Sequence, residues 1–524
     1  MKTNNHKKNT NNYLDDSKKN EPLHSNFAAP APEQASNTKS IIEKSNSIVN
    51  EDSNNPVITK GKINIKGKLI PYTATTGYMN IMDDDDKGIV VAKMFYISYV
   101  RSDISSSNKK RPVTFAFNGG PGSSSVWLHM GALGPKRVVL TKKGDMMKPP
   151  GSMINNEYSW LKFTDLVFID PISTGYSRPE KDENKEQFHG LDEDVKSVGK
   201  FVYSYTTQNN RWLSPKFIAG ESYGTTRAAH LSNHLIERYG MYVNGLVLIS
   251  MVLDFQTIDF NISNELPFAL FIPTYTATAM YHGKLDSDLT ADKENTLQEV
   301  RDWVLNNYIV YLSKGQSPSK DEHNEITEKL SKYTGLSKNF IVSANNRIDI
   351  RRFTKELLRV ERKTVGRLDS RFTGFDRDAA GENYEHDPSY ENVIYGPFTA
   401  TLHHHIRDNL GFKSDLPYEI LTDKVNPWNY GDARINGSPS VSESLRKAMT
   451  KNRFLKVYIA NGWYDFATPF FASEYTINHL SLEPVLQKNI SMKYYRSGHT
   501  VYIKKSSLIQ FTKDVDTFYS NTLS

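Results

Sequence analysis

The sequence predicts an α/β fold, with a central mostly parallel sheet, flanking helices and a largely helical insertion. Short apolar runs alternate with helical patterns from residue 111 onward, as buried parallel strands joined by crossover helices do. About 200 residues with many charges and few strand-like runs then separate GLVLIS (245–250) from FLKVYIAN (454–461). The simplest interpretation is one sheet that is interrupted by a helical insertion and completed by the last strands.

The order of these patterns predicts four regions along the 524-residue chain. The N-terminal segment is rich in Asn, Ser, Lys and Pro without a helical or strand period, which is typical of a disordered tail. Alternating apolar and polar positions follow it, and they predict a β-meander or hairpins. The predicted regions are a polar tail (1–55), the first part of the sheet domain (56–254), the helical cap insertion (255–450) and the last strands (451–524).

Composition excludes several classes of protein. The 65 basic and 59 acidic side chains are scattered along the chain, so the net charge of +6 forms no basic stripe and predicts no nucleic-acid partner. The longest apolar stretches, such as residues 247–253, are far shorter than the roughly 18 residues of a membrane span. The absence of cysteine excludes disulfides, a cysteine nucleophile and the usual structural zinc sites.

The N-terminus has positive charge but no apolar segment of the kind that marks a secretory signal. We therefore expect a cytoplasmic protein. Nothing in the sequence indicates an oligomeric state.

A nucleophile motif stands at residues 220–224, where GESYG has the form G-x-S-x-G. The strand-like KFIA precedes it and an amphipathic helical pattern follows it. The five-residue pattern alone is weak, but a strand, a sharp turn and a helix form the context that lifts a serine hydroxyl above a sheet edge. The context predicts Ser222 as a nucleophile.

A serine hydroxyl needs a base to take its proton, and the base needs an acidic residue to orient it. In this type of sheet the expected chain order is Ser, Asp or Glu, then His. Asp465 follows the strand-like KVYIANGWY, and His499 follows MKYYR. Because both lie at strand carboxyl ends, where catalytic loops gather, they are the candidate orienting acid and base.

A glycine-rich segment, NGGPGSSS (118–125), follows the apolar strand VTFAF. Adjacent glycines leave backbone N–H groups open to a substrate, as an oxyanion hole requires. The alternative is a phosphate-binding loop, which the absence of a following Lys-Ser or Lys-Thr and of GxGxxG spacing disfavours.

Five ordered segments resemble the serine carboxypeptidases, peptidase family S10 of the α/β-hydrolase fold, and most closely their bacterial carboxypeptidase-related branch. These segments lie within roughly residues 60–510, and they are FNGGPGSSS, NNEYSWLKFTDLVFIDPISTGYS, GESYGTTRA, ANGWYDFATP and SGHTVY. The resemblance implies an α/β-hydrolase fold and a serine-type carboxypeptidase that acts on peptides through an acyl-enzyme.

The resemblance also implies the roles of individual residues. Ser222 would be the nucleophile, His499 the general base and acid, and Asp465 its orienting acid. The amides of Gly120 and Tyr223 would form the oxyanion hole. The C-terminal carboxylate of the substrate would be held by Asn118, Gly119 and Glu221. A Glu beside the nucleophile can bind another carboxylate only while the two share a proton.

One departure from the family concerns carboxylate recognition. The family's peptidases usually carry a second Glu at the place of Ala132 in MGALGP. His129 lies one helical turn earlier; we expect a structural role for it, and partial substitution for this Glu is the alternative.

Other motifs receive no catalytic role. The run His403–His405 lies in a helical pattern, where adjacent side chains point in different directions, so we predict no metal site and no cofactor. Residues 367–378, RLDSRFTGFDRD, resemble a segment of the bacterial branch, and we assign them no chemical role.

The leading functional hypothesis is a serine carboxypeptidase, and the alternative is an esterase or acyltransferase on the same triad. The complete set of Ser, His, Asp and glycine loop argues against a non-catalytic scaffold.

Overall fold

The structure is a computed structural model that describes residues 55–83, 88–104, 111–435 and 437–524. The tail predicted for residues 1–55 therefore lies outside the described residues, apart from Asn55. Within the described ranges, no helix has both the length and the apolar character that crossing a membrane requires.

A single large sheet runs through the molecule in the order β1-β2-β3-β7-β4-β9-β10-β15-β16, and β8 pairs with β3 at one side. Pairing is antiparallel from β1 to β7 and parallel from β7 to β16, so the predicted hairpins lie beside the predicted parallel sheet. The strands are β1 (Val57–Ile65), β2 (Lys68–Met82), β3 (Val90–Arg101), β4 (Val113–Phe117), β7 (Asp165–Ile169), β8 (Arg178–Pro179), β9 (Lys216–Glu221), β10 (Gly245–Ile249), β15 (Lys456–Gly462) and β16 (Ile490–Tyr495).

Small two-stranded sheets lie outside this one. They pair β5 (Lys136–Val138) with β6 (Met153–Asn155), β11 (Lys363–Val365) with β12 (Thr373–Phe375), and β13 (Arg434–Ile435) with β14 (Ser438–Pro439).

The parallel strands β4, β7 and β10 are buried on both faces, which explains their largely apolar sequences. Leu246 and Leu248 of β10 pack into one hydrophobic core together with helices α2 and α3. Val247 and Ile249 point the other way, into a second core that includes Phe511 of α16. The alternation follows from the period of two along a strand.

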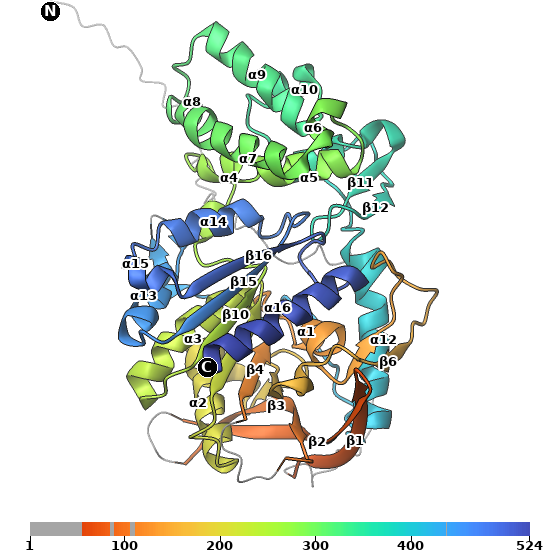
Figure 1. The fold of residues 1–524 in the computed structure, drawn as a ribbon, viewed down its shortest axis with the longest axis vertical. Helices are drawn as coiled ribbons and strands as arrows, with labels where there is room; N and C mark the ends of the chain where they lie inside the picture. The colour runs from red at the N-terminus through yellow and green to blue at the C-terminus, as the bar shows by residue number, and fades with distance from the viewer. Residues whose placement is uncertain (1–54, 84–87, 105–110, 436) are drawn as a thin grey trace, which may run out of the picture.

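Helices cover both faces of the sheet and form a lobe beyond it (Figure 1). Those around the sheet are α1 (Val126–Leu128), α2 (Leu191–Gln208), α3 (Tyr223–Tyr239), α12 (Gly396–His404), α13 (Ser442–Lys451), α14 (Phe470–Asn478), α15 (Pro484–Gln487) and α16 (Lys505–Leu523). Those of the lobe are α4 (Leu266–Leu270), α5 (Ile272–Tyr281), α6 (Ser287–Ala291), α7 (Lys293–Trp303), α8 (Ile309–Ser313), α9 (Lys320–Thr334), α10 (Lys338–Ser343) and α11 (Ile350–Glu356).

The predicted insertion contributes to two places. Helices α4–α11 form the lobe at the top of Figure 1, whereas α12 lies along the sheet domain and contacts α1. Phe398 of α12 packs at 5.2 Å, centroid to centroid, against Trp127 of α1. The chain between α11 and α12, which includes β11 and β12, thus passes from the lobe to the region above the sheet (Figure 1).

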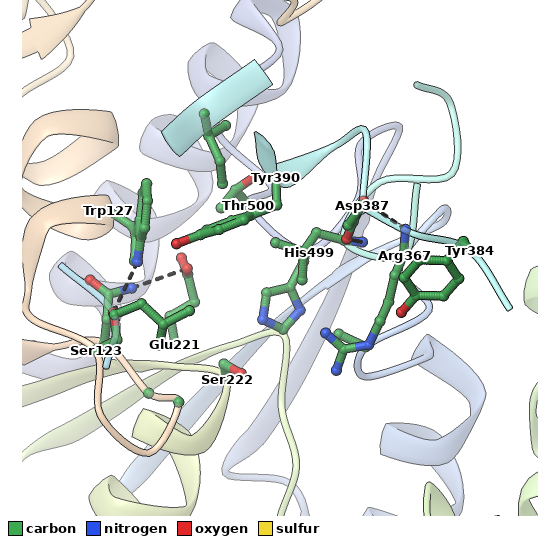
Figure 2. A pocket seen from close by; sticks show the side chains of 17 residues that line it. Ser123, Trp127, Glu221, Ser222, Arg367, Tyr384, Asp387, Tyr390, His499 and Thr500 are labelled. Atoms are coloured by element: carbon green, nitrogen blue, oxygen red, sulfur yellow. Dashed lines mark hydrogen bonds between the residues drawn. The ribbon is translucent and has the colours of Figure 1, made fainter. Parts of the chain in front are cut away.

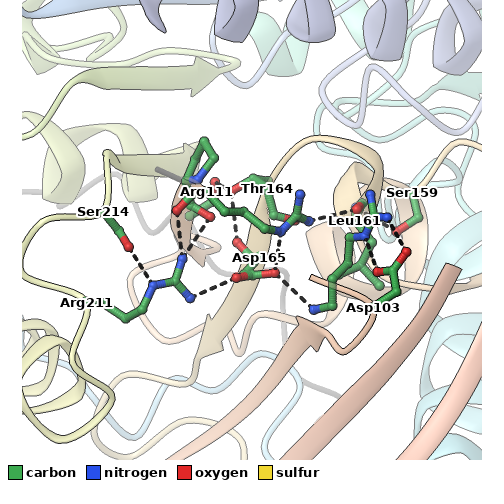
Figure 3. Close-up of polar contacts among 11 residues, drawn as sticks. Asp103, Arg111, Ser159, Leu161, Thr164, Asp165, Arg211 and Ser214 are labelled. Atoms are coloured by element: carbon green, nitrogen blue, oxygen red, sulfur yellow. Dashed lines mark hydrogen bonds and ion pairs between the residues drawn. The ribbon is translucent and has the colours of Figure 1, made fainter. Parts of the chain in front are cut away.

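A buried polar cluster lies at the amino-terminal ends of the parallel strands (Figure 3). The Asp165 carboxylate, at the start of β7, receives a hydrogen bond from Arg111 Nε at 2.8 Å and one from Arg211 Nη1 at 2.8 Å. Arg111 Nη2 also donates to the backbone carbonyls of Leu161 and Thr164, and Arg211 Nε donates to Ser214 Oγ at 2.7 Å. The two guanidinium groups therefore share the Asp165 carboxylate and have further acceptors, as charges in low-dielectric surroundings require.

Replacing Asp165 by alanine is expected to lower the free energy of unfolding by about 3–5 kcal/mol, because two nearly buried guanidinium groups would lose their counterion. Urea titration followed by circular dichroism measures the change. Asp103→Ala is the matched control, since it breaks the more exposed pair with Arg101 and should cost at most about 1 kcal/mol. Equal losses in the two variants would contradict the expectation.

Candidate active site

Ser222 lies on the sharp turn between β9 and α3, with a backbone φ of 61° that non-glycine residues rarely adopt. A Cβ at Gly220 would come within 2.1 Å of the Gly224 carbonyl oxygen, and one at Gly224 within 2.9 Å of the Phe117 oxygen. Only glycine therefore fits two residues before and two residues after the serine, which explains the G-x-S-x-G pattern. The Ser222 N–H donates to Ile249 O at 3.0 Å and ties the turn to β10.

Asp465 and His499 follow β15 and β16, the two strands on the far side of β10. His499 Nδ1 lies 2.8 Å from Asp465 Oδ2, and the carboxylate is completely buried. The same carboxylate accepts hydrogen bonds from the amides of Ala467 and Thr468 and from the Thr468 hydroxyl. These bonds fix its orientation toward the imidazole.

The environment of His499 has opposing effects on its charge. Burial by itself lowers the pKa of the imidazole, but the charge and hydrogen bond of Asp465, together with the charge of Glu221, outweigh it. The pKa of His499 is consequently raised above its ordinary value. A neighbouring anion that stabilises the imidazolium has this effect.

The glycine loop lies directly against the nucleophile turn. A Cβ at Gly119 would come within 2.4 Å of the Tyr223 nitrogen, so the two backbones touch. Gly120 has a φ of 107°, a conformation open mainly to glycine. The Tyr223 amide is at the first position of α3, where no helical carbonyl lies four residues earlier to accept from it.

A buried ion pair holds the start of this loop. Arg227, one turn into α3, donates to the Asn118 carbonyl at 2.6 Å and to Asp194 of α2 at 2.6 Å. Its guanidinium also lies over the rings of Phe117 and Tyr223. The loop and the nucleophile turn are thus connected through one side chain.

Asn118 and Glu221 form a polar pair beside Ser222. Asn118 Nδ2 donates to Glu221 Oε1 at 3.1 Å, and Asn118 Oδ1 accepts from the Leu128 amide, which fixes the amide orientation. Burial raises the pKa of Glu221 to about 7, although the charge of His499 and a polar contact with the Tyr502 hydroxyl act in the opposite direction. The carboxyl therefore holds its proton in mildly acidic solution.

These residues surround a cavity that, together with the solvent space at its mouth, has an empty volume of about 870 Å³ (Figure 2). Six of the eight site residues predicted from sequence line it: Asn118, Gly119, Gly120, Glu221, Ser222 and His499. The other two do not line it: Asp465 contacts the Nδ1 side of the His499 ring, and the Tyr223 side chain packs in the core. Trp127 also lines the cavity and donates from Nε1 to Ser123 Oγ at 2.9 Å.

A second wall of the cavity was not predicted from sequence. It comes from the chain between β11 and α12, and it consists of Arg367, Leu368, Tyr384, Asp387, Tyr390 and Ile394. The motif at residues 367–378 was the available signal, but its position in space cannot be read from its composition.

The same segment supports the histidine loop. The His499 amide donates to Leu368 O at 2.6 Å, and the Gly498 amide donates to Asp369 Oδ2 at 2.9 Å. Arg371 pairs with Asp369 and reaches Ser497 Oγ at 3.2 Å. Residues 368–371 therefore fix the backbone that carries the imidazole.

Three histidines noted in the sequence, His129, His404 and His405, lie away from the catalytic pair. His129 and His405 both lie with Nε2 2.8 Å from the Tyr99 hydroxyl, and burial lowers the pKa of each. His404 faces Asp408 on the exposed side of the helix. His129 does not line the cavity, so it is a structural residue and not a substitute for the missing Glu. In the described residues, no cluster of side chains has the arrangement of a metal site.

The chain is similar to known carboxypeptidases. A family model described as serine carboxypeptidase, Peptidase S10, matches residues 64–515. Among curated proteins, the pheromone-processing carboxypeptidase KEX1 of Saccharomyces cerevisiae is 32% identical over 161 residues, which are 29% of this chain and 21% of that protein. Serine carboxypeptidase-like 8 of Arabidopsis thaliana is 25% identical over 159 residues, 29% of this chain and 33% of that protein.

The chain thus aligns with a third or less of the length of either relative. The crystal structure of Kex1Δp, a prohormone-processing carboxypeptidase from Saccharomyces cerevisiae, matches 86% of this chain and 91% of its own, with a TM-score of 0.52 and 18% identity. This match confirms the expected α/β-hydrolase fold.

Proposed function

The chain belongs to the serine carboxypeptidase family, and from this we propose that it removes C-terminal residues from peptides through an acyl-enzyme on Ser222. The observation that carries the proposal is the Asn118–Glu221 pair beside Ser222, in one cavity with His499. An anchor for a terminal carboxylate next to a nucleophile places the last peptide bond of a substrate at the reacting serine.

In the first half of the proposed reaction, Ser222 Oγ attacks the carbonyl carbon of the last peptide bond and passes its proton to His499 Nε2. Asp465 orients the imidazole and stabilises its positive charge. The amides of Gly120 and Tyr223 donate to the oxyanion as it forms. His499 then gives the proton to the leaving amine, the peptide bond breaks, and the remaining acyl group stays on Ser222.

In the second half, water attacks the acyl-enzyme with His499 again acting as base. The ester bond breaks, the proton returns to Ser222 Oγ, and the shortened peptide leaves with a new carboxylate. The leaving amino acid and the shortened peptide together account for the one water consumed.

A second candidate function is an esterase or acyltransferase on the same triad. Ala132 favours it, because this buried residue lacks the carboxyl that the family's peptidases usually carry there. An alcohol or amine acceptor would replace water in the second half of the reaction.

Mass spectrometry of a mixed peptide library, with C-terminally amidated copies as controls, separates these functions. A carboxypeptidase shortens the free-acid peptides one residue at a time and leaves the amidated copies intact. Preference for amidated peptides or small esters, or transfer to added alcohols and amines, would replace the carboxypeptidase proposal by the alternative.

The pH dependence should report on Glu221. Below about pH 7 its carboxyl carries a proton and can donate to a substrate carboxylate, whereas above it two negative charges face each other. We expect kcat/KM for a free-acid peptide to fall about tenfold per pH unit above this value. Activity on an ester should lack this fall, and in Glu221→Gln the fall should disappear for the peptide also, because an amide donates at every pH.

The acidic limb should have a different origin. His499 must be neutral to act as base, so the rate on every substrate declines below the raised pKa of His499. Because Glu221 already carries its proton in this range, Glu221→Gln removes no charge there and should leave the acidic limb nearly in place. A fall above about pH 7 that persists in this variant would exclude Glu221 from carboxylate binding.

A further inference from the structure

Arg367 lies on the cavity wall opposite Glu221. In Figure 2, Glu221, Trp127 and Ser123 are on one side of the Ser222 and His499 side chains, and Arg367, Tyr384 and Asp387 are on the other. Among the described residues that line the cavity, Arg367 alone has a side chain that is cationic at every physiological pH. The cavity therefore has a fixed positive group in addition to the catalytic histidine.

The backbone of Arg367 is fixed on both sides. Its N–H donates to Asp387 Oδ1 at 3.1 Å, and its carbonyl accepts from the Phe466 amide at 3.0 Å, next to Asp465. The following residue, Leu368, accepts from the His499 amide at 2.6 Å. Backbone hydrogen bonds thus connect Arg367 and its neighbour Leu368 to the loops that carry Asp465 and His499.

The side chain of Arg367 points from this wall toward the catalytic pair (Figure 2). The Asp387 carboxylate, on the same wall, accepts from the amides of Arg367, Leu368 and Ser389. In Figure 2 the Arg367 side chain extends away from Asp387 toward Ser222 and His499. Its charge is felt by the ionisable groups near it, since it acts to lower the pKa of His499 and of the Tyr384 hydroxyl.

We propose that Arg367 binds a carboxylate of the peptide substrate, on the side of the catalytic pair opposite Glu221. This inference rests on the proposed peptidase function and adds a preference for acidic substrates. A guanidinium binds a carboxylate through two parallel hydrogen bonds, which gives orientation as well as affinity. Because the Asn118–Glu221 pair is the anchor for a terminal carboxylate, the carboxylate at Arg367 is expected to be an Asp or Glu side chain.

The test measures binding in a Ser222→Ala background, so that it does not depend on turnover. Calorimetry gives the Kd of N-blocked Phe-Glu and Glu-Phe dipeptides, of the same dipeptides with Gln in place of Glu, and of the C-terminal amides of all four. Arg367→Gln is compared with the parent, and Arg367→Lys tests whether charge alone suffices. Arg496→Gln is the matched control, because Arg496 is exposed on the loop before Ser497 and does not line the cavity.

Arg367→Gln should weaken the Glu-containing ligands about ten- to a hundredfold, with free or amidated ends alike, and change the Gln ligands less than about threefold. If it weakens every free acid but no amide, the bound carboxylate is the terminal one, and the role of Arg367 as a carboxylate ligand still stands. Equal effects on all eight ligands, or none, would overturn the proposal.

The same dipeptides incubated with the parent enzyme test the proposed function separately. Failure to cleave any free-acid dipeptide would count against the peptidase, whereas the binding contrast would still decide the role of Arg367.

Discussion

Replacing Ser222 by alanine is expected to lower kcat by about 10⁴-fold or more, with little change in stability. The hydroxyl is the only side-chain group of the proposed mechanism that forms a bond to the substrate carbon, and alanine removes it without filling new space. The amides of Gly120 and Tyr223 remain, so a small residual rate above the uncatalysed reaction should persist.

A fluorophosphonate reagent gives a second measure, because it reacts with a base-activated serine and not with ordinary surface serines. Ser222→Ala should abolish labelling, while Ser343→Ala, which changes an exposed serine of α10, should leave labelling and turnover as they are. Labelling that survives in Ser222→Ala would remove this residue from the mechanism.

Replacing Asp465 by asparagine is expected to lower kcat about 10⁴-fold, although the change is nearly isosteric. The carboxylate accepts from His499 Nδ1 and thereby leaves Nε2 free to receive the serine proton. The asparagine side chain can keep the bonds from the Ala467 and Thr468 amides to its oxygen, which turns its NH₂ group toward the imidazole. The histidine must then accept at Nδ1 and carry its proton on Nε2, where it cannot act as base.

The pH profile separates this effect from a loss of structure. Asp465 is a main cause of the raised pKa of His499, so the acidic limb should move to lower pH in Asp465→Asn while the melting temperature changes little. Thr468→Val is the matched control, since it removes one hydrogen bond to the same carboxylate and should cost about tenfold in kcat. Comparable losses in the two variants would argue against the tautomer explanation.

The arrangement of the candidate catalytic residues was predictable because each of them has a local signature in the sequence. Ser222 lies between two glycines at a strand-to-helix turn, and Asp465 and His499 each follow an apolar strand. Parallel strands bring their carboxyl ends to one edge of a sheet, so their order along the chain was enough to bring these residues together.

The second wall of the cavity was not predictable for the opposite reason. Arg367 and Asp387 lie in irregular chain, where no period of two or 3.6 indicates which side faces a partner. The Arg367 carbonyl accepts from the Phe466 amide and the neighbouring Leu368 carbonyl from the His499 amide, and both donors are roughly 100 residues or more away in sequence. The packing of α12 against α1 is likewise a contact between distant segments. Such contacts arise from the assembled fold and leave no local pattern.

The position of β15 next to β10 has a consequence for biosynthesis. The two strands are paired in the sheet but separated by roughly 200 residues of chain, which a ribosome needs about 10–40 s to add. During that interval the apolar edge of β10 has no partner strand, a state that invites pairing with other chains. A growing chain should therefore depend on chaperones at this stage, and it can hold no working triad until the residues around His499 have been made.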